Sequence, residues 1–145
     1  MGRAVVDTNV LIDYKNTRAD DRHRRAVDIV RGIDSGELPT GVVTDSVLLE
    51  TLNWIHERQR HDIAIDLRQR LSESAGFEIV HSAQADFHRA VELFETYEGL
   101  AFGDATIAAY MERTELEYLY TWDDDFDALD SCIRLSSAEN PFDSQ

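Results

Sequence analysis

"RAVVDTNVLID" (residues 3–13) places an aspartate directly after a short apolar run. Residues 3–6 are small or β-branched apolar side chains next to one arginine, a pattern that favours a buried strand. The polar residues that begin at Asp7 predict that this strand ends there and continues into a loop. The stretch therefore puts a carboxylate at the carboxyl end of the first strand.

The rest of the chain alternates short apolar runs with segments of helical periodicity. Gly36 is expected to end the first helix, and Asp45 or Ser46 to cap the second. The alternation predicts an α/β fold with a parallel sheet of four to five strands, and the lack of a Pro/Gly-rich linker predicts a single domain over residues 1–145. Further strands are expected at 38–43, 77–80, 117–120 and 132–135, and helices at 20–34, 45–58, 61–75, 83–98 and 103–116.

The composition is strongly acidic. The 145 residues include 29 Asp and Glu against 14 Lys and Arg, which gives a formal net charge of −15, and Lys15 is the only lysine. An acid excess with almost no lysine predicts a halophilic protein of haloarchaeal origin. The lone cysteine, Cys132, indicates a reducing cytoplasm, and no apolar run is long enough to span a membrane.

Four acids stand out because they adjoin apolar segments rather than polar ones. Asp7 and Asp123 follow predicted strands, whereas Glu50 lies in "SVLLETLNW" (46–54) and Asp104 in "LAFGDATIAAYM" (100–111). The carboxyl ends of parallel strands share one edge of the sheet, where functional groups gather. Four carboxylates in one pocket need a compensating cation, so a shared site predicts Mg²⁺ or Mn²⁺, ions that suit phosphodiester hydrolysis.

Two alternatives follow from the same residues. An apolar strand that ends in aspartate also begins phosphoaspartate enzymes, which typically carry D-x-D and a lysine far downstream. Here Asn9 occupies the second position and Lys15 lies only eight residues after Asp7, which disfavours a phosphatase-like enzyme. Asp104 could instead be a helix N-cap or a first-turn acid stabilised by the helix dipole.

The acids occur in motifs whose order resembles that of the PIN-domain ribonucleases, in particular the VapC-type toxins of toxin–antitoxin modules. "VVDTNVLID" (5–13) resembles the opening motif of the family. This likeness implies that Asp7 is a catalytic metal ligand supported by Thr8 and Asn9. "VLLETLNW" (47–54) looks like the helix that carries a second metal-binding acid, here Glu50.

The resemblance continues in the second half of the chain. "FGDATIAA" (102–109) is similar to the third motif of the family, which implies Asp104 as a third metal ligand. "TWDDDF" (121–126) is similar to the pattern T-x-D-x-x-F, which implies Asp123 as the fourth ligand, with Thr121 in support and Phe126 completing the pattern. Asp125 is an alternative for the fourth position.

The resemblance implies a three-layer α/β/α sandwich and a Mg²⁺- or Mn²⁺-dependent endoribonuclease that cuts single-stranded RNA. It also implies a homodimer and a cognate VapB-type antitoxin that lies across the active-site groove. Two other functions stay open: a catalytically idle module that only binds protein, and a PIN nuclease in RNA processing rather than toxicity.

Arginines form two clusters that could contact RNA phosphates, although the chain as a whole is acidic. We hypothesise that one cluster flanks the groove, with Arg22, Arg24 and Arg25 as the candidates. The alternative is that these arginines balance neighbouring acids on exposed helices. The clusters are Arg18, Arg22, Arg24 and Arg25, and Arg58, Arg60, Arg68 and Arg70.

Overall fold

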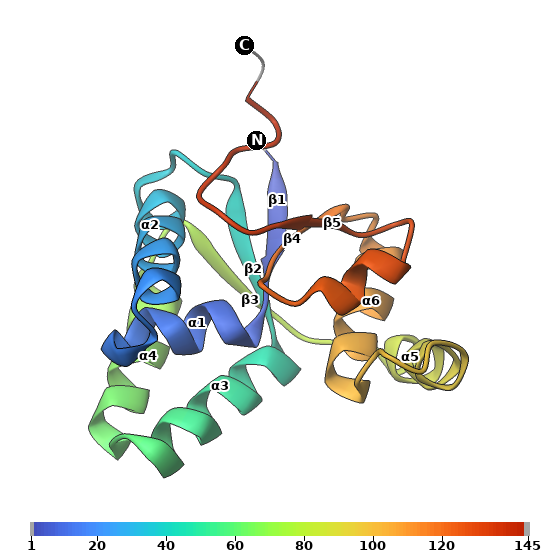
Figure 1. The fold of residues 1–145 in the computed structure, drawn as a ribbon, viewed down its shortest axis with the longest axis horizontal. Helices are drawn as coiled ribbons and strands as arrows, with labels where there is room; N and C mark the ends of the chain where they lie inside the picture. Colours follow the sequence, from blue (N-terminus) through green and yellow to red (C-terminus); the bar gives the residue numbers. More distant parts are fainter. Residues whose placement is uncertain (1, 144–145) are drawn as a thin grey trace.

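A computed structural model describes residues 2–143 of the chain (Figure 1). The strands are β1 (Arg3–Val6), β2 (Thr40–Thr44), β3 (Phe77–Val80), β4 (Tyr118–Tyr120) and β5 (Ile133–Leu135). The α-helices are α1 (Thr8–Lys15), α2 (Asp21–Ser35), α3 (Asp45–Arg58), α4 (His61–Glu73), α5 (Gln84–Thr96) and α6 (Phe102–Thr114). Two short 3₁₀ helices are η1 (Thr17–Ala19) and η2 (Asp124–Ala128).

All five strands form one parallel sheet in the order β3-β2-β1-β4-β5. Figure 1 shows α2 and α4 on one side of the sheet and α5 and α6 on the other. Ala4, Val5 and Val6 of the central strand are fully buried between these layers. The structure thus confirms the predicted α/β/α sandwich and its parallel sheet. No helix within residues 2–143 combines the length and apolar character that crossing a bilayer requires.

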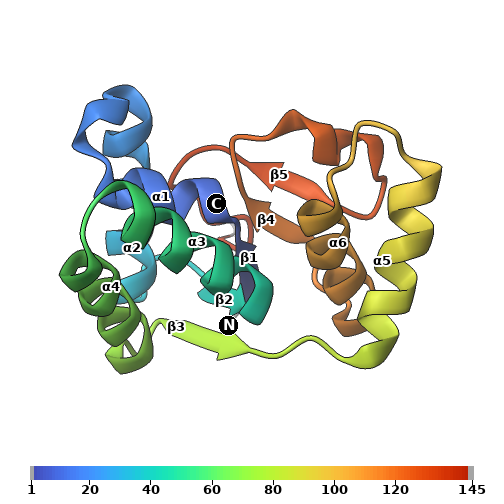
Figure 2. The same cartoon turned by 90° about the horizontal axis from the view of Figure 1, so that it is seen from below.

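The direction in which strands are added reverses at β1. The chain passes from β1 outward to β2 and β3, then returns through α5 and α6 to place β4 on the other side of β1. Val5 accordingly pairs with Val42 on one side and with Leu119 on the other. Such a reversal is where open α/β sheets bind ligands, at the carboxyl ends of the strands. Figure 2 looks toward this edge, next to which α1 and α3 begin.

The segment after Asp7 differs from the prediction. The sequence predicts a loop there, whereas the chain turns directly into α1, and Asp7 is its N-cap. The helix is only eight residues long and buries few apolar side chains, among them Val10 and Leu11. Its apolar pattern is therefore too short to predict a helix from the sequence, although aspartate is a common N-cap residue.

Several element ends also shift. Strand β2 begins at Thr40 rather than at residue 38, because the Leu38 N–H donates to Gly32 O (3.0 Å) at the end of α2 and Pro39 has no N–H to give the sheet. The predicted caps Asp45 and Ser46 are wrong. Thr44 is the N-cap of α3, and its hydroxyl accepts a hydrogen bond from Val47 N (3.3 Å).

Candidate active site

Asp7 is a buried carboxylate at the junction of β1 and α1. The residue is 4 % exposed, Oδ1 accepts a hydrogen bond from Thr8 N (2.7 Å) and Oδ2 accepts one from the Thr121 hydroxyl (2.8 Å). Burial raises the pKa of Asp7 to about 6 against the effect of these bonds, and the negative charges of Asp123 and Glu50 raise it further. The carboxylate is thus held in a fixed orientation beside other acids.

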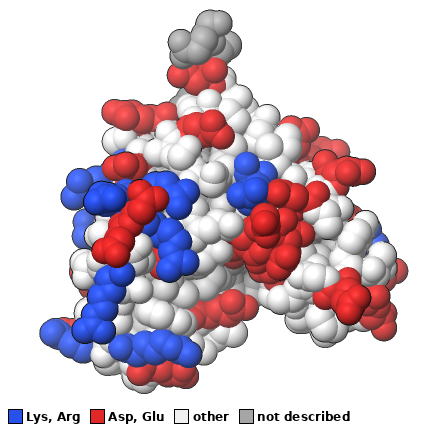
Figure 3. Space-filling view, viewed as in Figure 1, with Lys and Arg blue, Asp and Glu red and all other residues white. Residues whose placement is uncertain are grey.

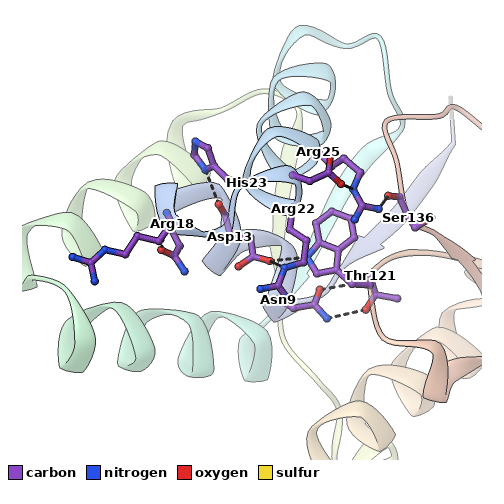
Figure 4. Close-up of polar contacts among 11 residues, drawn as sticks. Asn9, Asp13, Arg18, Arg22, His23, Arg25, Thr121 and Ser136 are labelled. Atoms are coloured by element: carbon purple, nitrogen blue, oxygen red, sulfur yellow. Dashed lines mark hydrogen bonds and ion pairs between the residues drawn. The ribbon is translucent and has the colours of Figure 1, made fainter.

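Thr121 joins Asp7 to the end of β4. This threonine is fully buried, and its oxygen accepts hydrogen bonds from Asn9 Nδ2 (3.1 Å) and Asp123 N (3.0 Å). Asn9 Oδ1 in turn accepts a bond from Trp122 N (3.4 Å), so that Asn9 and Thr121 face each other across the two elements (Figure 4). The structure therefore brings the predicted supporting residues together around Asp7 and Asp123.

Asp104 lies in the first turn of α6 and not at its N-cap, which is Ala101. Burial raises the pKa of Asp104 to about 8, and the charges of Asp7, Asp123 and Glu50 add to this, together with a hydrogen bond to Asp123. Like charges disfavour ionisation only at short range. The four acids predicted from the sequence consequently lie within electrostatic reach of one another, although they come from separate helices and strand ends.

Glu50 reaches the site from α3, on which it is exposed. Its Oε1 lies 2.6 Å from the position that a Cβ atom would occupy at Gly103, in the first turn of α6. That space is available only because residue 103 has no side chain. Gly103 thus allows the Glu50 carboxylate to lie directly beside the backbone that carries Asp104.

The stretch from Asp123 to Asp125 adds a second acidic feature. Carboxylate oxygens of Asp123, Asp124 and Asp125 lie within 4.8 Å of one another, with Asp123 partly buried and the other two exposed. Asp123 Oδ1 accepts a hydrogen bond from Asp125 N (2.9 Å), and the charge of Asp123 raises the pKa of Asp125. Asp127 instead pairs with Arg134 (2.9 Å), while Phe126 is fully buried in the core.

The site has the donor set that a hard divalent cation requires. Its candidate ligands are carboxylate oxygens, which Mg²⁺ and Mn²⁺ prefer. Within residues 2–143 no Lys, Arg or His forms an ion pair with Asp7, Glu50, Asp104 or Asp123, since every ion pair there involves other acids. None of these four acids thus has a close ion-pair partner among the described residues, and the residues fit a bound cation.

The candidate RNA-binding arginines lie at the start of α2. Arg22 pairs with Asp13 (3.5 Å), whereas Arg24 and Arg25 pair with Asp21 (3.7 and 3.0 Å). Figure 3 shows basic side chains gathered over the side of the molecule that carries α1, α2 and α4, next to a strongly acidic centre. In the other cluster, Arg58 and Arg60 pair with acids of their own segment, Glu57 and Asp62.

Asp13 is a buried acid that the sequence does not reveal. It lies four residues after Asn9 on α1, so the two side chains share a face of that helix. Because the sequence predicts a loop in this region, nothing distinguishes Asp13 from the acidic surface. A correctly predicted α1 would have placed it next to the site.

Fold and site together define a class: a parallel α/β protein that gathers acids at the reversal point of its sheet. The chain belongs to the PIN-domain family, whose model matches residues 4–131. No curated protein sequence matches it.

Solved structures with the same fold include several toxin–antitoxin proteins. The chain is 23 % identical to the Mycobacterium tuberculosis toxin VapC20, which cleaves the sarcin–ricin loop, over 88 % of this chain and 95 % of that one, with a TM-score of 0.72. It is 25 % identical to a toxin–antitoxin complex from Klebsiella pneumoniae (90 % and 95 % covered, TM-score 0.66). It is 14 % identical to Rickettsia felis VapBC2 bound to promoter DNA (92 % and 97 %, TM-score 0.68).

Proposed function

We propose that residues 1–145 form a single PIN domain that acts as a VapC-type toxin, a Mg²⁺- or Mn²⁺-dependent endoribonuclease for single-stranded RNA. The observation that carries the proposal is the convergence of four acids at the reversal point of the sheet, where Thr121 bonds both Asp7 and the Asp123 backbone and Glu50 lies against the first turn of α6. Burial and the neighbouring acids raise the pKa of Asp7 and Asp104 there. Asp7, Glu50, Asp104 and Asp123 would hold the ion.

A divalent ion in this site would activate water for attack on a phosphodiester and stabilise the leaving oxygen. The residues of the chain itself orient the ligands. Thr8 and Thr121 donate to the two oxygens of Asp7, and Asn9 fixes Thr121 and the backbone after it. Asp125, whose N–H bonds Asp123, is the alternative or additional ligand at the fourth position.

RNA would approach from the basic side of the molecule. The acids of the site repel phosphates, so binding needs positive charge close by. Arg22, Arg24 and Arg25 on α2 are the candidates to supply it, and Arg25 packs over the ring of Trp122 (4.9 Å), just after the end of β4. This location supports that cluster over the one on α3 and α4 as the RNA-binding one.

Protein partners in the proposal are a VapB-type antitoxin and a second copy of the chain. Solved relatives of the same fold include VapBC complexes, which supports the antitoxin. An exposed apolar patch supports a protein contact: Phe102 packs edge-on against both Phe87 and Phe94 (5.6 Å each), all three are at least 38 % exposed, and Leu49 on α3 is 62 % exposed.

The direct test is a cleavage assay on labelled single-stranded RNA in high salt with Mg²⁺, Mn²⁺ or EDTA. We expect internal cleavage with either metal and none with EDTA. Metal-independent cleavage would contradict the proposed chemistry, and Mn²⁺ binding without cleavage would favour the idle, protein-binding module. Growth arrest on expression, together with relief by co-expression of a small protein encoded next to this gene, would separate a toxin from an RNA-processing nuclease.

Gly103 offers a milder test of the metal site. Gly103→Ala should displace the Glu50 carboxylate, whose Oε1 occupies the space of the new methyl group. We expect about tenfold weaker Mn²⁺ binding by calorimetry, the loss typical of disturbed ligand support. The Tm should stay unchanged or rise slightly, because the tip of a glutamate moves easily and alanine favours helix.

Gly99→Ala is the matched control for this substitution. A Cβ atom at Gly99 would make only ordinary contact with Asp125 Oδ1 (3.8 Å). Its Mn²⁺ affinity should equal that of the wild type. Equal affinities in both variants would place Glu50 outside the metal site.

A further inference from the structure

Asp13 is a buried carboxylate with partners on α2 and in the segment that follows β4. The residue is 6 % exposed, and Oδ2 accepts a hydrogen bond from Trp122 Nε1 (2.8 Å). The same oxygen pairs with Arg22 Nε at 3.5 Å. Figure 4 shows the Arg22 side chain running from α2 toward Asn9 and the end of β4. Asp13 therefore links the basic helix α2 to the residue that follows Thr121.

The Trp122 ring is held from a second direction by Arg25. The guanidinium lies over the ring, 4.9 Å from its centroid, an arrangement with cation–π attraction. Arg25 is itself restrained, because Nη1 donates to Ser136 O (3.0 Å) and Nε pairs with Asp21 (3.0 Å). The ring thus has a hydrogen bond at its edge and an arginine on its face.

These contacts are continuous with the acidic site. Trp122 stands between Thr121 and Asp123 in the chain, and Thr121 donates a hydrogen bond to Asp7. The backbone N–H of Trp122 donates to Asn9 Oδ1. The ring therefore projects from the backbone segment that joins Thr121 to Asp123. A buried carboxylate is a costly way to join two elements that apolar side chains could also join. Unlike an apolar side chain, this carboxylate also fixes the position of Arg22 through the ion pair.

We propose that Asp13 and Trp122 are positioning residues that hold Arg22 and Arg25 against the acidic site, where the arginines bind RNA backbone phosphates. The proposal rests on the function proposed above. Arg22 pairs with Asp13 through Nε, which leaves its two terminal NH₂ groups to donate to a phosphate, and its side chain is 56 % exposed. Restraint before binding lowers the entropy lost when RNA binds.

The test measures binding of a fluorescein-labelled single-stranded RNA 12-mer by anisotropy, in an Asp104→Asn background that prevents cleavage. We expect Asp13→Asn and Arg22→Gln each to weaken binding about tenfold, a loss typical of one charge-assisted contact. The double variant should bind no more weakly than Arg22→Gln alone. Arg22→Gln should also reduce the slope of log Kd against log salt by about 0.7.

The matched control is Arg18→Gln. Arg18 belongs to the same arginine cluster and lies in η1, just before α2, but its side chain extends away from Thr121 in Figure 4. Its Kd should change less than about twofold. The Asp13→Asn variant should fold, because its amide oxygen remains an acceptor for Trp122 Nε1. Trp122→Phe, which keeps an aromatic ring and loses the N–H, is a second variant and should weaken binding as Asp13→Asn does.

Kinetics in the active protein distinguish positioning from a purely structural role. Asp13→Asn should raise KM about tenfold and leave kcat within about twofold, because the arginines contact RNA away from the reacting bond. An unchanged Kd and KM, or additive losses in the double variant, would overturn the proposal, as would wild-type protein that does not bind RNA. If RNA binds, and its Kd depends on Asp13 and Arg22 as expected, but no cleavage occurs, only the proposed nuclease activity is refuted.

Discussion

Replacing Asp104 by asparagine should lower kcat/KM for RNA cleavage by about a thousandfold, the upper range for loss of a single electrostatic group in an active site. The same substitution should make the metal-free protein more stable. Asp104 is disfavoured as an anion by burial and by Asp7, Asp123 and Glu50, and asparagine has no charge to lose. Opposite effects on activity and stability are characteristic of a functional site.

The measurement pairs a cleavage assay with thermal unfolding in EDTA. Asp130→Asn removes an exposed acid from the same acidic stretch as Asp123 and is the control, with activity and Tm close to the wild type. Asp123→Asn and Asp125→Asn, compared in the same assay, decide which of them supplies the fourth ligand. Full activity of Asp104→Asn would remove this residue from the site.

The stability of the metal-free protein should fall as the pH rises from about 4 to about 8. The pKa values of Asp7 and Asp104 are raised from 3.8 to about 6 and about 8, so the folded state binds more protons than the unfolded state throughout this window. Stability declines with pH wherever the folded state binds more protons. Above about pH 8 both acids are ionised in both states, and their contribution no longer changes.

Bound Mn²⁺ should reverse this trend, because its ligands must be deprotonated. We expect Tm differences on the order of 10 °C between pH 5 and 8 in EDTA, given that one pKa unit is about 1.4 kcal/mol. The experiment records Tm at fixed high salt, which screens the rest of the acidic surface. An Asp7→Asn/Asp104→Asn variant should flatten the EDTA curve, and an equally steep curve in that variant would assign the effect to other acids.

The sequence predicts the sheet well, because short apolar runs such as residues 3–6 and 77–80 have no other plausible structure in a chain of this composition. It also predicts which acids adjoin apolar segments, and the structure brings Asp7, Glu50, Asp104 and Asp123 within electrostatic reach. Their roles stay predictions. A parallel sheet places strand ends together whatever the details of the loops, which is why position along the strands is informative.

Other features depend on packing that no local pattern contains. The fit of Glu50 against Gly103 exists only once α3 and α6 are side by side. The hydrogen bond from Trp122 to Asp13 joins residues 109 positions apart. No local sequence pattern distinguishes Asp13 from the many surface acids of this chain. The sequence places the start of β2 too early because Leu38 has the apolar character of a strand residue but bonds to α2.

The place of β1 in the sheet determines when the acidic site can assemble during synthesis of the chain. β1 is the first strand to leave the ribosome, but one of its two neighbours is β4, at residues 118–120. Until that segment emerges, one edge of β1 is unpaired, and Asp7 lacks the hydroxyl of Thr121. Asp123 follows only three residues later than the end of β4. For the proposed nuclease, a nascent chain therefore has no assembled site beside the message being translated until residues 121–123 have left the ribosome and paired with the end of β1.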